Sequence, residues 1–170
     1  MTSAIVDSFS VGSIKNSPNA GGPANRSSIQ EAASPIKNKP RLGCAGVIRR
    51  GEGVLLGKRG KEPNRGLWVL PGGGVEFGES FENTLRREIR EEAGIEIDIE
   101  SVFDVYQLIN PPYEHRVIVY LLANHRAGEP VPSSDLSEVQ FFDREQLREL
   151  ENSNLISPFV VKVLQQAGLL

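Results

Sequence analysis

The sequence predicts an α+β fold, a mixed β-sheet flanked by helices and arranged as an α/β/α sandwich. Several short apolar or alternating segments are typical of strands: residues 44–48, 54–56, 67–70, 95–99, 102–109, 116–123 and 139–142. Few segments are patterned as helices: residues 80–93, 143–150 and 157–167. Because helices do not alternate regularly with strands, a doubly wound parallel sheet is not expected.

Residues at the ends of these segments support the predicted boundaries. Asp143 precedes the second helix and Ser157-Pro158 begins the third, and these residue types commonly begin helices. Gly94 follows the first helix, where a glycine commonly ends one. Pro71 and the glycines at 72–74 are expected to end the third strand and to form a loop.

The first 40 residues differ in composition from the rest of the 170-residue chain. They are rich in Ser, Asn, Gly, Pro and Ala, so they cannot bury enough apolar surface to offset the entropy lost on ordering. We therefore predict a flexible low-complexity tail over residues 1–40 and one folded domain over residues 41–170. A docking or targeting arm is the functional alternative for the tail.

Composition and charge limit the classes of partner. Hydrophobic residues make up 39% of the chain and charged residues 24%, which is typical of a globular protein in water. The net charge of −3 does not indicate bulk binding to nucleic acid, and no segment has the roughly 18 apolar residues that span a membrane. The only cysteine, Cys44, can form no intramolecular disulfide, so we predict a cytoplasmic protein.

Acidic residues on the first predicted helix point to a metal site. Glu88, Glu91 and Glu92 are spaced i, i+3 and i+4, so they share one face. They lie at the edge of an apolar stripe formed by Phe81, Leu85 and Ile89. Carboxylates clustered beside apolar surface repel one another and lose solvation, and Mg²⁺ relieves both effects. An ordinary solvated helix surface is the alternative, and the charges alone do not decide between the two.

Neighbouring residues can support these acids. Arg87 and Glu91 are separated by one helical turn, so Arg87 can hold Glu91 in place. Glu79, just before the helix, can accept hydrogen bonds from first-turn amides or from a neighbouring arginine. A carbonyl of the glycine loop can supply one more oxygen to a metal ion.

The order of residues from 73 to 95 resembles a complete Nudix box. Its fixed positions are Gly73, Glu79, Arg87-Glu88-Ile89, Glu91-Glu92 and Gly94-Ile95. A pattern of this length is far more specific than a lone glycine motif. The resemblance to Nudix hydrolases covers roughly residues 41–170 and implies the Nudix fold.

The resemblance also implies a cofactor and a reaction. The expected ligands of Mg²⁺, or of Mn²⁺ in its place, are Glu88, Glu91, Glu92 and the Gly72 carbonyl. Arg87 is expected to orient the glutamates, and Glu79 to support the box. The expected reaction is attack of water on the pyrophosphate bond of a nucleoside diphosphate derivative. A homodimer is expected because dimers are common in this family.

The general base and the substrate-binding residues stay open. In the family the base is either a box glutamate, here Glu88, or an acid of a later loop, where the candidates are Glu114, Glu129 and Glu138. We favour Glu138, which immediately precedes a predicted strand, as the base or as an additional metal ligand. Arg59 can reach a substrate phosphate or face solvent, and Tyr113 can line the substrate site.

Pro111 resembles a feature of ADP-ribose-directed members, so ADP-ribose or a nucleotide sugar ranks ahead of a nucleoside triphosphate. Two other functions stay open: a nucleotide-sensing Nudix module without turnover, and an isomerase of an isoprenoid diphosphate. The full set of glutamates favours hydrolysis over both.

Overall fold

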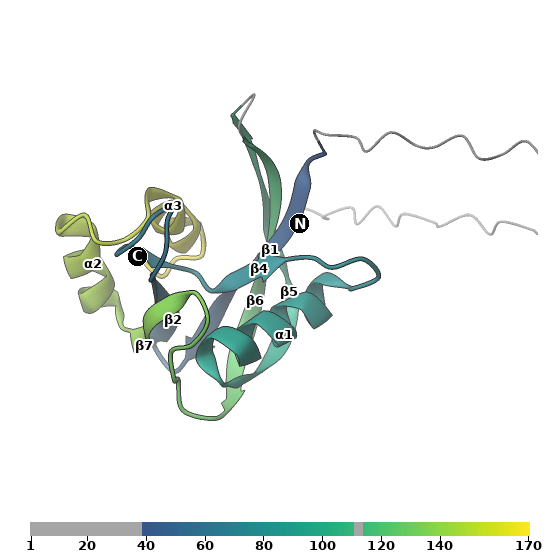
Figure 1. Cartoon of the computed structure of the whole chain (residues 1–170). Coiled ribbons are helices and arrows are strands. Elements are labelled where there is room, and N and C mark those ends of the chain that lie inside the picture. Colours follow the sequence, from purple (N-terminus) through teal and green to yellow (C-terminus); the bar gives the residue numbers. More distant parts are fainter. Residues whose placement is uncertain (1–38, 111–113) are drawn as a thin grey trace, which may run out of the picture. The chain divides into compact units, whose positions relative to one another are not determined.

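The computed structural model describes residues 39–110 and 114–170 (Figure 1). Its strands are β1 (Arg41–Arg50), β2 (Gly53–Arg59), β3 (Trp68–Val69), β4 (Gly72–Gly74), β5 (Glu96–Asn110), β6 (Glu114–Ala127) and β7 (Leu136–Phe142). Its helices are α1 (Phe81–Ala93), α2 (Arg144–Asn152) and α3 (Pro158–Gln166). The predicted tail, apart from its last two residues, lies outside the described residues, and so do Pro111 and Tyr113.

The strands form one mixed sheet. Five strands follow the order β3-β2-β1-β6-β5, while β4 pairs with β1 and β7 pairs with β2. Strands β1 and β6 are parallel, and the other paired strands are antiparallel. Strand β1 is central in the sheet because it pairs with β2, β4 and β6. Its apolar residues need cover on both faces of the sheet.

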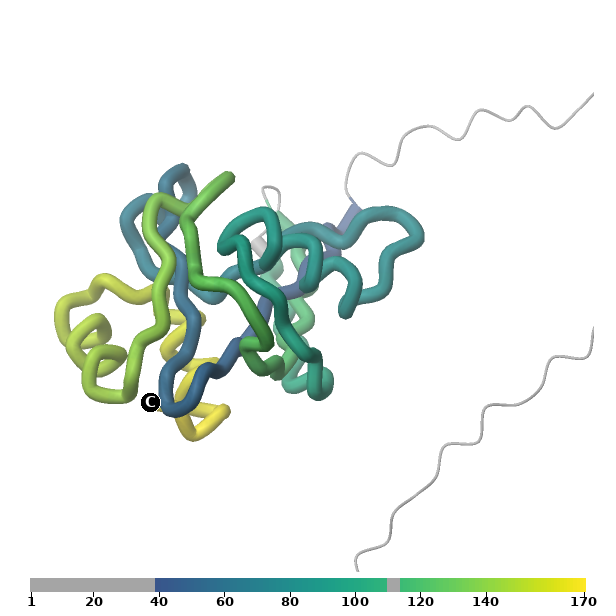
Figure 2. The backbone as a smooth tube through the Cα atoms, turned by 90° about the horizontal axis from the view of Figure 1, so that it is seen from below, coloured from purple at the N-terminus to yellow at the C-terminus, as the bar shows by residue number. Residues whose placement is uncertain are grey.

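Helices cover the sheet on both faces. Successive residues of β1 point to opposite sides, and Val47 and Ile48 belong to two different hydrophobic clusters. The Val47 cluster includes residues of α2 and α3, and the Ile48 cluster includes Leu85 and Ile89 of α1. Figure 2 shows α1 in teal, well apart from α2 and α3 in yellow-green. The predicted fold class is confirmed.

The helix boundaries follow the expected signals, with one difference. Ser80 caps α1 by accepting a hydrogen bond from the Asn83 N–H at 3.2 Å, and Gly94 ends the helix with a φ of 68°. Asp143 caps α2 in a reciprocal arrangement with Gln146. Ser157 precedes α3 as expected, but its side chain makes no capping hydrogen bond.

The strands differ from expectation in two places. Residues 95–99 and 102–109 were expected as two strands, but they belong to one long strand, β5, whose pairing with β6 is irregular around residues 99–104. The glycines at 72–74 were expected as a loop, but they pair with residues 43–45 of β1 and form β4. This pairing fixes the backbone that leads into α1. Within the described residues, no helix is both long and apolar enough to cross a bilayer.

Candidate active site

Arg87 connects the loop before α1 to the acidic face of that helix. Its guanidinium donates two hydrogen bonds to the Glu79 carboxylate, from Nε to Oε1 at 2.9 Å and from Nη2 to Oε2 at 3.0 Å. The same group donates from Nη1 to Glu88 Oε1 at 2.7 Å and from Nη2 to the Gly74 carbonyl at 3.1 Å. A guanidinium shared in this way fixes the Glu88 side chain relative to the glycine strand.

Glu79 is the fixed acceptor of this network. Besides Arg87, its Oε2 accepts hydrogen bonds from the Thr84 hydroxyl at 2.8 Å and the Glu76 N–H at 3.2 Å. The hydrogen bonds from Arg87, followed by that from Thr84, lower the pKa of Glu79 to about 2. The hydrogen bonds that Arg87 donates to Glu79 and Glu88 raise the pKa of Arg87. The Arg87–Glu79 pair therefore stays ionised at neutral pH. Its hydrogen bonds are consistent with the roles predicted for these residues, in which Arg87 orients the glutamates and Glu79 supports the box.

Glu88 explains why position 73 is a glycine. A β-carbon at Gly73 would overlap the carboxyl group of Glu88, so this carboxyl lies directly against the backbone of β4. The Glu88 side chain is only 15% exposed. Glu88 is therefore packed beside the sheet, as its place at the edge of the apolar stripe predicts.

Glu92 is the most buried acid of the three. The residue is 5% exposed, and its Oε2 accepts a hydrogen bond from the Gly72 N–H at 3.0 Å. Burial is the main cause that raises the pKa of Glu92, to about 7; the Gly72 hydrogen bond and the charge of Arg59 oppose the rise, and the charge of Glu88 adds to it. Gly72 has a φ of 150°, and a β-carbon there would overlap the Cys44 carbonyl, so the position requires glycine.

Glu88 and Glu92 line a cavity of about 540 Å³. Arg59 and Asp135 line the same cavity. Arg59 Nη1 lies 3.7 Å from Asp135 Oδ2, and Lys61 Nζ donates to Asp135 Oδ1 at 2.8 Å, which lowers the pKa of Asp135. The lining of one cavity therefore combines a cation, Arg59, with the carboxylates of Glu88 and Glu92, a set of groups that suits a phosphate bound through a divalent ion.

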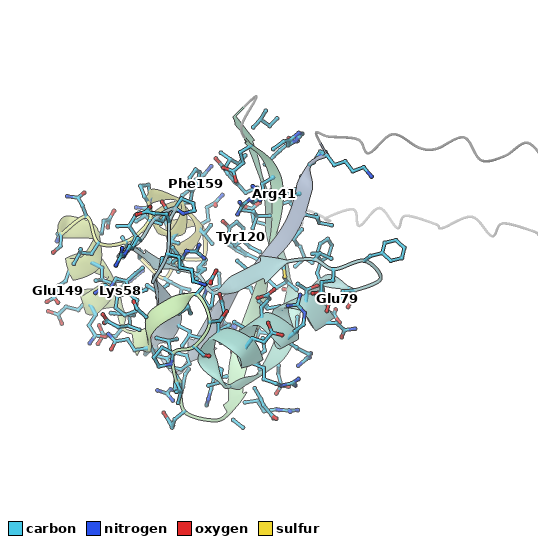
Figure 3. The ribbon with its side chains drawn as sticks, viewed as in Figure 1. Arg41, Lys58, Glu79, Tyr120, Glu149 and Phe159 are labelled. Atoms are coloured by element: carbon cyan, nitrogen blue, oxygen red, sulfur yellow. The ribbon has the colours of Figure 1, made fainter. Side chains whose placement is uncertain are left out.

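Aromatic and apolar side chains also line the cavity, together with the charged and polar side chains of Arg41, Arg116 and Asn64. Tyr106 of β5, Ile118 and Tyr120 of β6, and Phe159 of α3 are among the lining residues. Figure 3 labels Tyr120 and Phe159. The rings of Tyr106 and Phe159 are in contact, with centroids 5.0 Å apart and tilted by 59°. The sequence analysis did not identify Asp135, Tyr106 or Phe159, since each lies outside the Nudix box.

Other predicted site residues lie outside the cavity lining. Glu91 is exposed over 55% of its side chain and lies 3.5 Å from Arg87 Nη1. Glu138, our favoured loop acid, pairs with Lys58 at 2.9 Å on the neighbouring strand and is 55% exposed. Glu129 pairs with Arg50, and Glu114 with Arg116 and Arg41. The structure thus brings Glu88, Glu92 and Arg59 together and leaves Glu91 and Glu138 at the surface.

The donor set fits a magnesium ion. Among residues 39–110 and 114–170, no group of three or more His, Cys, Asp and Glu side chains is close enough to hold a metal by itself. Mg²⁺ does not need such a group, because it is commonly bound by one or two carboxylates together with waters and substrate phosphates. Glu88 and Glu92 supply two carboxylates on one cavity wall, with the Gly72 backbone beside Glu92.

Known proteins resemble this chain in sequence and in fold. The family described as the NUDIX domain matches residues 38–162. The chain is 34% identical over 112 residues to the ADP-ribose pyrophosphatase of Methanocaldococcus jannaschii, a match that covers 65% of this chain and 66% of that protein. It is 33% identical over 121 residues to the NAD-capped RNA hydrolase NudC of Haemophilus influenzae, covering 69% of this chain and 45% of that protein.

A solved structure agrees with these matches. The MutT NUDIX hydrolase of Burkholderia pseudomallei superposes with a TM-score of 0.67 at 31% identity, covering 76% of this chain and 98% of that one. The chain spans about half to two thirds of the length of the curated relatives named above. The family match covers most of the described domain and includes the whole Nudix box. The chain belongs to the Nudix family.

Proposed function

We propose that this protein is a magnesium-dependent hydrolase that cleaves the pyrophosphate bond of a nucleoside diphosphate derivative. The observation that carries the proposal is the convergence of Glu88, Glu92 and Arg59 on one cavity, with Glu88 held by Arg87. The carboxylates of Glu88 and Glu92 can hold the ion, which binds the diphosphate of the substrate. The guanidinium of Arg59 can bind a phosphate of this diphosphate directly. The bound ion supplies charge that stabilises the developing negative charge on the phosphate oxygens.

The residues of the box have separate roles in this proposal. Glu88 and Glu92 bind Mg²⁺, with the Gly72 carbonyl as an additional ligand. Glu91 lies outside the cavity lining, but its exposed side chain has room to turn toward the ion and to act as a further carboxylate ligand. Arg87 and Glu79 position Glu88.

We assign the role of general base to Glu88, which accepts the proton of the attacking water. Arg87 donates a hydrogen bond to Glu88 Oε1, whereas no described residue donates one to Glu88 Oε2, so Oε2 can accept the proton. Glu138, by contrast, is paired with Lys58 outside the cavity, so it is the weaker candidate for a base. Water adds to phosphorus as the bond to the bridging oxygen breaks.

ADP-ribose or a nucleotide sugar remains our first choice of substrate. The name of the relative from Methanocaldococcus jannaschii, an ADP-ribose pyrophosphatase, supports it. We keep the cytoplasm as the proposed compartment because the only cysteine, Cys44, is free and buried. The homodimer stays an expectation of the family resemblance.

Hydrolysis in ¹⁸O-labelled water tests the proposal. The full chain is incubated with Mg²⁺ and a panel of ADP-ribose, a nucleotide sugar, nucleoside triphosphates and an isoprenoid diphosphate, and the products are identified by mass spectrometry. We expect nucleoside monophosphate among the products, one ¹⁸O in one of the two phosphorylated products, which identifies the phosphorus attacked, and no turnover in excess chelator. Tight binding without product would instead identify a sensing module. Rearrangement of an isoprenoid diphosphate without ¹⁸O uptake would identify an isomerase.

A further inference from the structure

Asp135 is an acid of the cavity lining to which the proposed function gives no role. It directly precedes β7, and its carboxylate lies close to two cations. Lys61 Nζ donates a hydrogen bond to Oδ1 at 2.8 Å, and Arg59 Nη1 lies 3.7 Å from Oδ2. The Lys61 side chain is 68% exposed, whereas that of Arg59 is only 24% exposed and lines the cavity. Asp135 therefore connects a surface cation to the guanidinium that we propose binds phosphate.

The strand β2 directs Arg59 toward the face of the sheet that α1 covers. Arg59 has the same parity in β2 as Leu55, which packs in one hydrophobic cluster with residues of α1. The pairing of β2 with β7 shifts in register between Lys58 and Arg59, and such irregularities are common beside active sites, where they redirect a side chain. The Arg59 side chain therefore lies on the same side of the sheet as Glu92, the buried acid of α1.

The segment that leads into Asp135 is fastened at both of its ends. The Ser133 N–H donates a hydrogen bond at 3.0 Å to the Glu92 carbonyl, a last-turn carbonyl that has no partner within α1. The Asp135 carbonyl accepts a hydrogen bond at 2.8 Å from the N–H of Gly60, the residue after β2. Between them, Ser134 has a φ of 58°, which few residues other than glycine adopt. Residues 133–135 therefore fix the end of β2 relative to the C-terminal end of α1.

We propose that Asp135 is a positioning residue that holds the Arg59 guanidinium ready to bind a phosphate of the substrate. Residues 133–135 set the separation of this guanidinium from Glu92. The inference rests on the proposed function and adds to it a residue that governs substrate binding. A mobile arginine side chain loses rotamer freedom when it binds a ligand, whereas a side chain that is already held does not lose it again.

Charge repulsion and positioning predict opposite effects of neutralising Asp135. An acid that only repelled the diphosphate would weaken binding, so its neutralisation would lower KM. Loss of positioning would instead raise KM, because Arg59 would then have to be ordered by the substrate. The hydrogen bond from Lys61 offsets the charge of Asp135, so the three side chains together keep one positive charge. We therefore expect positioning to outweigh repulsion.

Steady-state kinetics of the full chain with Mg²⁺ and ADP-ribose test the inference. We expect Asp135→Asn to raise KM about fivefold and to leave kcat within about twofold. In an Arg59→Gln background the same change should alter KM by less than about twofold, because its effect passes through Arg59. Asp98→Asn is the matched control, since Asp98 lies 3.9 Å from Arg126 and outside the cavity lining, and it should change neither constant.

The kinetics can overturn the inference in three ways. An unchanged or lower KM in Asp135→Asn would mean that the carboxylate does not assist binding. An equal rise of KM in the wild-type and Arg59→Gln backgrounds would mean that Asp135 acts without Arg59. A fall in kcat larger than the rise in KM would assign Asp135 to the chemical step. Thermal unfolding verifies that each variant is folded, and Asp135→Ser, as a second variant, should show the same change in KM.

The order of the Arg59 side chain separates this inference from the proposed function. ¹⁵N relaxation of the arginine Nε–H groups measures that order without metal or substrate, and Arg59→Lys identifies the signal. We expect the order parameter of Arg59 to fall in Asp135→Asn and to stay unchanged in Asp98→Asn. If the wild type does not hydrolyse ADP-ribose, the proposed function fails for that substrate, and this measurement still decides whether Asp135 holds Arg59. Equal order parameters in the wild type and in Asp135→Asn overturn the inference, whatever the turnover.

Discussion

The two ends of the cavity are built in different ways. The glutamates of the polar end come from one stretch of sequence, residues 72–92, in which Arg87 is hydrogen-bonded to Glu79, Glu88 and Gly74, and only Arg59 and Asp135 join this end from elsewhere. The aromatic end consists of Tyr106 on β5 and Phe159 on α3, and Phe159 is 43% exposed. Pre-organised charge is what a chemical step requires, whereas an open apolar surface suits ligand recognition. We therefore expect changes to the glutamates and Arg87 at the polar end to alter kcat or metal binding, and changes at the aromatic end to alter KM.

Glu88→Gln is expected to have the largest effect. The amide keeps the shape of the side chain but removes a metal ligand and the proposed proton acceptor, so kcat should fall by about 10³-fold or more, or about 4 kcal/mol in the barrier. Steady-state turnover of ADP-ribose measures the loss. Glu82→Gln, on an exposed position of the same helix, is the control and should stay within twofold. A near-normal kcat in Glu88→Gln would contradict the assignment of the chemical step to the polar end.

The metal-free protein should lose stability as the pH rises from 5 to 8. Folded Glu92 keeps its proton up to a pKa of about 7, whereas the unfolded chain loses it near 4.5. Between these values the folded state binds more protons, so the free energy of unfolding falls, by about 2–3 kcal/mol across this window. The lowered pKa of Glu79 acts in the opposite direction but only at lower pH, so it adds no slope here.

Urea denaturation in chelator at pH 5 and pH 8 measures this effect. Glu92→Gln should abolish the difference while its amide oxygen still accepts the Gly72 N–H. Saturating Mg²⁺ at pH 8 should restore the stability of the wild type, because an ion that binds only the folded state stabilises it. Equal pH dependence in the wild type and in Glu92→Gln would show that the carboxyl is not the source.

Arg87→Lys should reduce kcat by about 10- to 100-fold. A lysine keeps the charge but cannot donate at once to Glu79, Glu88 and the Gly74 carbonyl, so Glu88 loses its fixed position. The measurement is kcat at saturating Mg²⁺ and substrate. Arg90→Lys, at an exposed position of α1, serves as control. Equal kcat for the two lysine variants would mean that the arginine network does not position the acid.

Arg59→Gln should have a smaller effect that falls mainly on KM. Arg59 lines the same cavity as the glutamates, and loss of one charged contact to a phosphate should raise KM about five- to tenfold. The matched substitution Arg65→Gln, at an exposed loop position, should leave KM unchanged. A larger effect on kcat than on KM would instead assign Arg59 to the chemical step.

The polar end could be predicted from sequence because its information is local. Helix periodicity places Glu88 and Glu92 beside the apolar stripe, and the structure buries Glu92 and partly buries Glu88, in keeping with that position. The cap at Ser80 and the stop at Gly94 follow from local backbone chemistry. The role of Gly73 could not be predicted physically, since it depends on where the Glu88 carboxyl packs.

The aromatic end could not be predicted, because no sequence spacing connects its parts. Tyr106 and Phe159 meet only after β5 joins the sheet and α3 packs over it. Asp135 is a loop acid without periodic context, so nothing distinguished it from Glu138, which the structure pairs with Lys58 instead. Strand β4 was missed because three glycines lack strand propensity, and only tertiary pairing with β1 makes them a strand.

The most direct test of the central claim is a crystal of the full chain grown with Mn²⁺ and measured for anomalous scattering. The account predicts an ion bound by carboxylate oxygens of Glu88 and Glu92 on the cavity wall beside Gly72, and no such peak in Glu88→Gln. A peak elsewhere, or none beside these carboxyls at saturating Mn²⁺, would contradict it.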